Sequence, residues 1–281
     1  MKRFKGSRWK SGARGTGREG FRVDRRRMLE KAKKEVREAF SRKDLMLVQG
    51  IRSLDELDEI KGLLYTRIDE WFKLNFPEFS VENEESACKI IAEFGCKEAL
   101  EEKKLAEIVG EKKGRELMDK AKASYGAPFE EGEVEALKQL AKKALSIFEA
   151  RKGIEKYINA EAPKHLKNLC YLVEPTLASR LVMIAGGLEK LAKMPASTVQ
   201  VIGAEKALFK HLRSGTKPPK HGIIFQSAYI RTAPFKERGK IARALSTKLA
   251  IAAKADFYTK HFIAEKLKEN LEKRLDEIKR A

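Results

Sequence analysis

The sequence is poor in cysteine and lacks long apolar runs. Its three cysteines, Cys88, Cys96 and Cys170, are odd in number and lack CxxC spacing. This pattern argues against a disulfide framework or a zinc site and for free thiols in a reducing compartment. No run of about 18 apolar residues occurs and the N-terminus has no apolar core, so neither a membrane span nor a secretory signal is indicated. We therefore expect a cytoplasmic protein that holds no metal and no cofactor.

Recognisable catalytic motifs are also missing. The sequence has four histidines but no HExxH, GxSxG, Walker loop or dinucleotide-binding glycine pattern. Cys170 and His165 lie five residues apart, but nothing in the sequence marks either as an activated nucleophile. We expect no enzymatic activity. The alternative from another class is a helical RNA-processing nuclease, which would lose activity but keep RNA binding on His221→Ala.

Basic residues dominate the charge of the chain. It has 281 residues with 60 Lys and Arg against 41 Asp and Glu, a net charge of +19 and a pI near 9.7. Such an excess favours a polyanionic partner, because phosphate contacts release condensed counterions. A ribosome-associated factor, or a basic helical protein that only needs solubility, is the alternative to a dedicated nucleic-acid binder.

The first 27 residues form a compositionally distinct segment. They contain 11 Lys and Arg, two acidic residues and interspersed glycines. Such a composition cannot form a core, so we predict a disordered basic arm over residues 1–27. Phe4, Trp9 and Phe21 are available to stack on bases, although a plain tail without RNA contacts fits the composition equally well.

Apolar residues then recur at helical spacing. Residues 28–79 predict N-terminal helices, with Trp71, Phe72 and Phe76 as core before Pro77. Residues 81–123 and 131–161 predict two long helices joined by a turn at residues 125–128. The second carries six apolar side chains at seven seam positions: Leu137, Leu140, Ala144, Ile147, Arg151, Ile154 and Ile158. We predict an antiparallel coiled-coil hairpin over residues 80–161, and its seam closes either within one chain or between two.

Residues 162–281 predict a second helical region. Apolar residues from Leu177 to Leu191 indicate one amphipathic helix with Gly186 and Gly187 inside it. Two later helices flank a Pro-Pro-Lys-His-Gly corner, since paired prolines cannot continue a helix. At about 100° per residue, the second of these helices has an apolar face and a basic face, the latter formed by Lys236, Lys240, Arg243, Thr247 and Lys254. The apolar positions of residues 267–278 predict a last helix that packs back on this region.

Several long strings in this region resemble the Nop domain of box C/D guide-RNA particles and of a related spliceosomal protein. They are PASTVQVIGAEKALFKHL at 195–212, PPKHG at 218–222 and RGKIARALSTKLAIAAKAD at 238–256, and residues 71–78 resemble the family's W..L.FPE corner. The resemblance spans about residues 42–260. It implies an all-α fold, with a long antiparallel two-helix coiled coil followed by a C-terminal helical Nop domain at 162–281.

The resemblance also implies a function. Nop domains grip a kink-turn RNA together with a small ribosomal-protein-like kink-turn-binding protein, so an RNA-binding ribonucleoprotein scaffold is expected here. At the matching motif position, His221 would stack on an unpaired base. The expected RNA contacts are His221, Lys220, Lys240, Arg243, Thr247, Lys254 and Arg238. The expected interface with the partner protein or RNA is Lys206, Lys210, His211 and Arg213.

The family further implies a dimer formed through the coiled coil. Members that guide RNA methylation carry an additional domain before the coiled coil, which docks the methyltransferase fibrillarin. Only about 40 residues precede the RKD segment here, so the chain resembles a short paralogue and fibrillarin is a doubtful partner. The alternative is a subunit of a box C/D RNA 2'-O-methylation particle, acting in mixed dimers with a longer paralogue that recruits fibrillarin.

Overall fold

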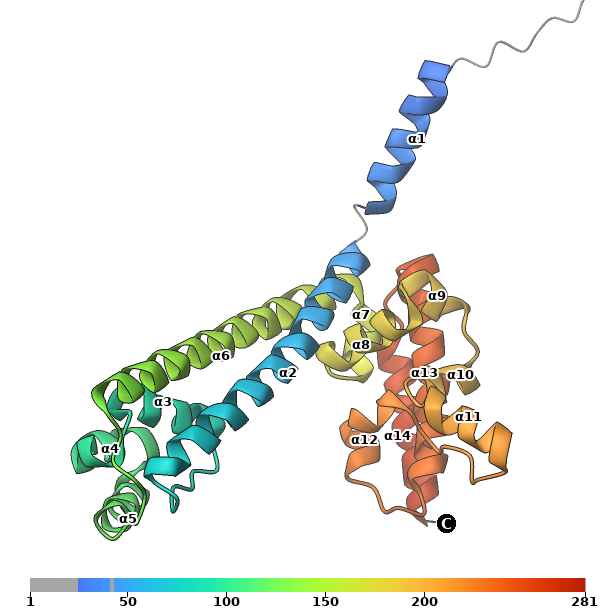
Figure 1. The fold of residues 1–281 in the computed structure, drawn as a ribbon. Coiled ribbons are helices and arrows are strands. Elements are labelled where there is room, and N and C mark those ends of the chain that lie inside the picture. Colours follow the sequence, from blue (N-terminus) through green and yellow to red (C-terminus); the bar gives the residue numbers. More distant parts are fainter. Residues whose placement is uncertain (1–24, 41–42, 281) are drawn as a thin grey trace, which may run out of the picture. The chain divides into compact units, whose positions relative to one another are not determined.

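The computed structural model describes residues 25–40 and 43–280, and these residues form helices and no strand (Figure 1). The all-α prediction is therefore confirmed. Helix α1 (Arg25–Phe40) forms a unit separate from the rest of the chain. Arg25–Arg27, predicted as the end of the basic arm, instead form the first turn of α1, since arginine is a good helix former. The rest of the predicted arm lies outside the described residues.

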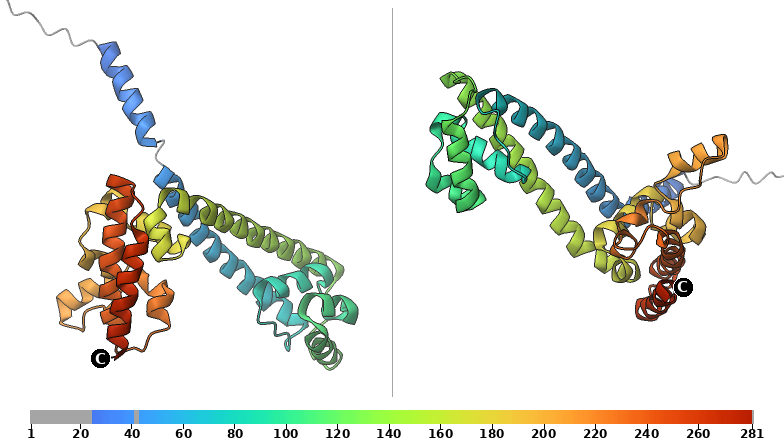
Figure 2. Two further views of the ribbon diagram at one scale, coloured as in Figure 1. Left: turned by 180° about the vertical axis from the view of Figure 1, so that it is seen from behind. Right: turned by 90° about the horizontal axis from the view of Figure 1, so that it is seen from below.

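Two long helices, α2 (Lys43–Asn75) and α6 (Glu131–His165), run antiparallel and side by side (Figure 1 and Figure 2). The coiled-coil prediction was right about α6 but wrong about its partner. Leu137 and Ala144 of the predicted seam are buried with Ile68 and Phe72 of α2. The seam thus closes within the chain.

The segment predicted as the other arm of the hairpin is instead broken into α3 (Glu84–Phe94), η1 (Lys97–Ala99), α4 (Glu102–Val109) and α5 (Glu111–Lys122). Glycines cause the breaks. Gly95 ends α3 in the left-handed conformation, with φ 73°, and Gly110 separates α4 from α5 with φ 85°. These short helices pack at the far end of the α2–α6 pair around Phe72, Phe76 and Phe79.

The remaining helices surround α13 (Arg238–Lys254). They are α7 (Lys167–Leu172), α8 (Pro175–Ala185), α9 (Leu188–Lys193), α10 (Ala196–Val201), α11 (Glu205–Ser214), η2 (Ile223–Gln226), α12 (Ala228–Arg231), the π-helical turn η3 (Ala255–Thr259) and α14 (Ala264–Arg280). Gly186 and Gly187 do not lie inside a helix as predicted. They end α8 with φ 78° and 124°, so α9 begins in a new direction. The predicted last helix is confirmed as α14, whose Leu271 is buried against this region.

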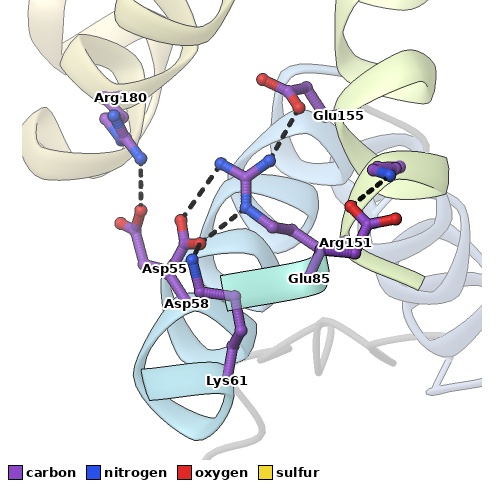
Figure 3. Close-up of polar contacts among 8 residues, drawn as sticks. Asp55, Asp58, Lys61, Glu85, Arg151, Glu155 and Arg180 are labelled. Atoms are coloured by element: carbon purple, nitrogen blue, oxygen red, sulfur yellow. Dashed lines mark hydrogen bonds and ion pairs between the residues drawn. The ribbon is translucent and has the colours of Figure 1, made fainter. Parts of the chain in front are cut away.

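One apolar cluster joins the base of the α2–α6 pair to this region, because Leu47, Ile51 and Ile158 belong to the same core as Leu245 and Leu271. Polar contacts reinforce this arrangement. Arg180 of α8 donates from Nη2 to Asp55 Oδ1 of α2 at 2.7 Å across the junction, and Arg151 of α6 donates from Nε to Asp58 Oδ1 of α2 at 2.6 Å within the pair (Figure 3). The helices around α13 are thus fixed on the α2–α6 pair. No helix of the described residues is both long and apolar enough to cross a membrane.

Candidate nucleic-acid interface

The Pro-Pro-Lys-His-Gly corner is held rigidly against the end of α10. Gln200 Nε2 donates to Lys220 O at 2.8 Å, and its own backbone carbonyl accepts from Gly222 N at 2.8 Å. Ile223 N donates to Ile202 O at 2.8 Å. A Cβ atom on Gly222 would lie 1.9 Å from the carbonyl oxygen of Ile202, so only glycine fits here.

This corner places His221 in a stack of rings and cations. The imidazole of His221 lies parallel to the ring of Phe225, with centroids 4.7 Å apart and an interplanar angle of 15°. The Arg238 guanidinium lies 5.3 Å from the Phe225 centroid and 6.0 Å from that of Phe235, while Lys220 Nζ lies 4.2 Å from the Phe235 centroid. Arg238 is further fixed by donating from Nε to the carbonyl of Ala233 at 3.0 Å. The structure therefore brings together His221, Lys220 and Arg238, three of the residues that the sequence analysis named as expected RNA contacts.

The surroundings of His221 favour its neutral form. Burial lowers the pKa of the imidazole below its ordinary value of 6.5, and the positive charges of Arg238 and Lys220 lower it further. A neutral ring in a plane already set by Phe225 can stack on an unpaired base without losing a hydrated charge. The cations beside it remain free to meet phosphates.

The basic face of α13 is divided between a groove and an isolated end. Lys240, Arg243 and Thr247 line a groove of about 550 Å³ between α13 and α14. The Thr247 hydroxyl donates to the Arg243 carbonyl at 2.9 Å, so its hydrogen is already engaged. Lys254 is exposed at the C-terminal end of α13 and does not line the groove.

The other predicted residues lie on α11. Lys206, Lys210 and Arg213 are exposed, while His211 is half-buried and its Nδ1 contacts the Thr216 carbonyl. No residue of α11 is buried. This helix therefore projects its side chains outward instead of packing into the core.

Three exposed apolar side chains at this interface were not predicted. Phe209 and Leu212 on α11 are 59% and 69% exposed, and Phe235 is 69% exposed beside the His221 stack. Apolar residues three positions apart on a helix, such as Phe209 and Leu212, usually indicate a buried face, so the sequence does not indicate that they face outward. The region that carries them is strongly basic, with 24 Lys and Arg against 10 Asp and Glu over residues 162–281.

The Cys170 thiol is not an activated nucleophile. Burial, and less so the nearby charge of Asp256, raises the pKa of Cys170 to about 12, so the thiol stays protonated at neutral pH. His165 lies near Glu161, with 3.7 Å between Nε2 and the carboxylate oxygen. Within residues 25–40 and 43–280, no group of three or more His, Cys, Asp and Glu is placed to hold a metal ion.

An all-helical chain with a basic helix face beside a rigid, ring-stacked histidine has the features of an RNA-binding protein. Sequence comparison identifies the family of RNA-binding proteins to which it belongs. The Nop family, described as "snoRNA binding domain, fibrillarin", matches residues 53–277, and the chain belongs to this family.

Individual relatives agree with the family match. An uncharacterized NOP5 family protein of Methanocaldococcus jannaschii is 42% identical over 257 residues, covering 89% of this chain and 61% of the relative. Nucleolar protein 56 of Homo sapiens is 32% identical over 244 residues, covering 84% of this chain and 41% of the relative. The chain thus spans between two fifths and three fifths of these proteins.

A solved structure also shares the fold. The crystal structure of a fibrillarin/Nop5p complex contains a chain that matches with a TM-score of 0.54 and 26% identity, over 92% of this chain and 81% of that chain.

Proposed function

We propose that this protein is a non-catalytic RNA-binding scaffold of a box C/D-type ribonucleoprotein. It recognises a kink-turn RNA together with a small ribosomal-protein-like kink-turn-binding protein. The observation that carries the proposal is the His221 corner, a rigidly held imidazole stacked on Phe225 between cations, inside the segment that matches the Nop family.

Each part of the interface has a role in this proposal. His221 stacks on an unpaired base, and Lys220 and Arg238 neutralise the phosphates beside that base. Lys240 and Arg243 contact the phosphates that follow, and Thr247 accepts a hydrogen bond from the RNA. Lys254, at the exposed end of α13, contacts the RNA only where the RNA extends past the groove.

The partner protein docks on α11. Its exposed Phe209 and Leu212 provide the apolar contact that cations alone would not give, since buried apolar anchors dominate protein interfaces. Lys206, Lys210, His211 and Arg213 surround these two side chains and meet either the partner or its RNA. Neither the RNA nor the small protein presents this composite surface alone, so this chain binds the preformed complex.

A gel shift on a kink-turn RNA, with and without the small kink-turn protein, tests the proposal. We expect a shift only in the ternary mixture, and we expect His221→Ala and the double variant Lys240→Ala/Arg243→Ala to weaken it. Lys31→Ala on α1, an exposed lysine outside the interface, is the control. A shift by the protein alone that neither variant changes would contradict the proposal.

A second candidate function is suggested by the fibrillarin complex that contains the structural neighbour. In this reading the chain is a subunit of a 2'-O-methylation particle, paired with a longer paralogue. Ile60, Leu63 and Leu74 on one side of α2 are 44%, 74% and 64% exposed and would provide apolar contacts in such a dimer. Copurification with that paralogue and with fibrillarin, lost on Leu63→Glu, would support it, and copurification with neither would remove it.

A further inference from the structure

Helix α14 supplies a second wall of cations to the groove beside α13. Lys240, Arg243 and Lys248 come from α13, and Lys273 and Arg274 come from α14, which also contributes Asn270. Glu277 is the one carboxylate among the residues that line this groove, and it accepts from Arg274 Nη1 at 2.5 Å. Five cations against one carboxylate make the groove a site for anions.

The dimensions of the groove suit a chain of phosphates. Lys240 and Thr247 are seven positions apart, as are Asn270 and Glu277, which is about 10 Å along a helix at 1.5 Å per residue. Phosphates of one strand follow one another about every 3.4 Å along a duplex axis. The groove therefore accommodates two or three consecutive phosphates, with cations on both sides.

The groove and the His221 corner share helix α13. Arg238, which lies over the rings of Phe225 and Phe235, begins this helix, and Lys240 of the groove follows two positions later, about 200° around the helix. An RNA strand with one base stacked at His221 therefore passes around the first turn of α13 to reach the groove.

We propose that the α13–α14 groove binds the sugar-phosphate backbone of the RNA beyond the kink-turn, with Lys273, Arg274 and Asn270 of α14 as direct contacts. This inference rests on the proposed function, because it extends the same RNA site. On binding, Arg274 exchanges the Glu277 carboxylate for a phosphate oxygen. Helix α14 is then part of the RNA interface as well as a packing element.

The salt dependence of binding tests the α14 contacts. Each phosphate contact adds roughly 0.7 to 0.9 to the slope of log K against log salt. The double variant Lys273→Gln/Arg274→Gln should therefore lower that slope by roughly 1.4 to 1.8. The probe is a kink-turn RNA with an extended stem, bound to the small kink-turn protein, and the readout is fluorescence anisotropy from low to high salt.

A matched control removes the same charge from the other flank of α14. Lys268 and Lys279 lie about 120–180° around the helix from the groove residues, Lys268 against Tyr171 and Lys279 near Asp276. Lys268→Gln/Lys279→Gln should keep the wild-type slope. If both double variants change it equally, or neither does, the groove is not the RNA site.

Glu277→Gln should strengthen RNA binding, an effect that a folding defect cannot produce. Removing this carboxylate releases Arg274 and takes a negative charge out of the groove, so RNA binding should become several-fold tighter. Glu272→Gln, on the opposite flank of α14, should leave binding unchanged. If Glu277→Gln binds no more tightly than wild type, the proposed contact of Arg274 with phosphate is wrong.

These outcomes separate the groove from the function as a whole. If the wild-type protein does not bind the ternary probe, the proposed function and the groove both fail. If wild type binds and His221→Ala weakens binding while the α14 variants behave like wild type, the function stands and the groove proposal is overturned. An acidic peptide that binds the groove while RNA does not would equally overturn it.

Discussion

The Gly222→Ala substitution tests whether the rigid corner creates the RNA site. The backbone of Gly222 has φ −106° and ψ −133°, so a positive φ is not what requires glycine here. The added Cβ would nevertheless lie 1.9 Å from the Ile202 carbonyl oxygen, and backbone cannot yield as a flexible side chain would. The corner must therefore move away from α10.

The cost of that movement follows from the contacts that it breaks. Three hydrogen bonds join the corner to residues 200–202, and each contributes about 0.5–1.5 kcal/mol, so the loss is about 1.5–4.5 kcal/mol. At about 2–4 °C per kcal/mol for a domain of this size, the melting temperature should fall by roughly 3–18 °C. RNA binding should fall further than stability alone explains, because His221 leaves its stack on Phe225.

Thermal melting and the ternary gel shift measure these two effects on one sample. Gly153→Ala is the control, since a Cβ at this exposed position inside α6 meets nothing within 4 Å. It should stabilise the protein by about 0.5–1 kcal/mol and leave RNA binding unchanged. If Gly222→Ala melted and bound RNA like wild type, the corner would not depend on this close approach and the reasoning would be refuted.

Three further predictions concern polar groups in or near the core. Because the pKa of His221 is lowered in the folded state, the unfolded chain binds the proton first, so stability should fall as the pH drops below about 6.5, and less so in His221→Phe. A double-mutant cycle of Arg180→Ala and Asp55→Ala should give a coupling energy of about 0.5–1 kcal/mol, because their 2.7 Å ion pair is only partly exposed. Asn168→Ala should lower the free energy of unfolding, measured by chemical denaturation, by about 2–4 kcal/mol. The buried Asn168 side chain donates to the Asp256 carboxylate and accepts from the Ile263 amide, and the substitution leaves both groups without this partner.

A specific result would contradict each of these predictions. An NMR titration of His221 with a pKa at or above the ordinary value would contradict the first. The coupling energy between Arg180 and Asp55 should be larger than the coupling energy between Arg67 and Glu70, a far more exposed ion pair. Equal coupling energies in the two cycles would contradict the second prediction. Asn168→Ala unfolding at the wild-type denaturant concentration would show that the Asp256 carboxylate finds other partners.

The helices around α13 could largely be predicted from the sequence, whereas the pairing of α6 could not. The apolar face of α13 follows directly from 3.6-residue periodicity and is buried, whereas the predicted seam of α6 is buried at Leu137, Ala144 and Ile158 and half-buried elsewhere. Periodicity does not say which helix a seam meets. Residues 81–123 also have helical spacing, and only the left-handed backbone at Gly95 and Gly110 shows that they fold as separate short helices.

The same limit applies to the site. The family strings and the basic residues identified His221, Lys240 and Arg243, and these residues line the corner and the groove. The sequence did not predict that Phe235 is exposed beside His221 or that cations of α14 line the groove. An apolar residue or a lysine has the same place in a sequence pattern whether its side chain faces a groove, the core or open solvent. Tertiary packing decides that, and α14 contributes to the groove only because it folds back against α13.

The most direct test of the account compares the equilibrium affinity of the wild-type protein for a kink-turn RNA alone with its affinity for the same RNA bound to the small kink-turn protein. Anisotropy at physiological salt gives both constants. We predict binding of the preformed complex at least a hundredfold tighter than binding of RNA alone, a coupling of about 2.8 kcal/mol at 1.4 kcal/mol per factor of ten. Equal affinity for both would show that the basic charge of the chain binds RNA without any composite surface, and would contradict the account.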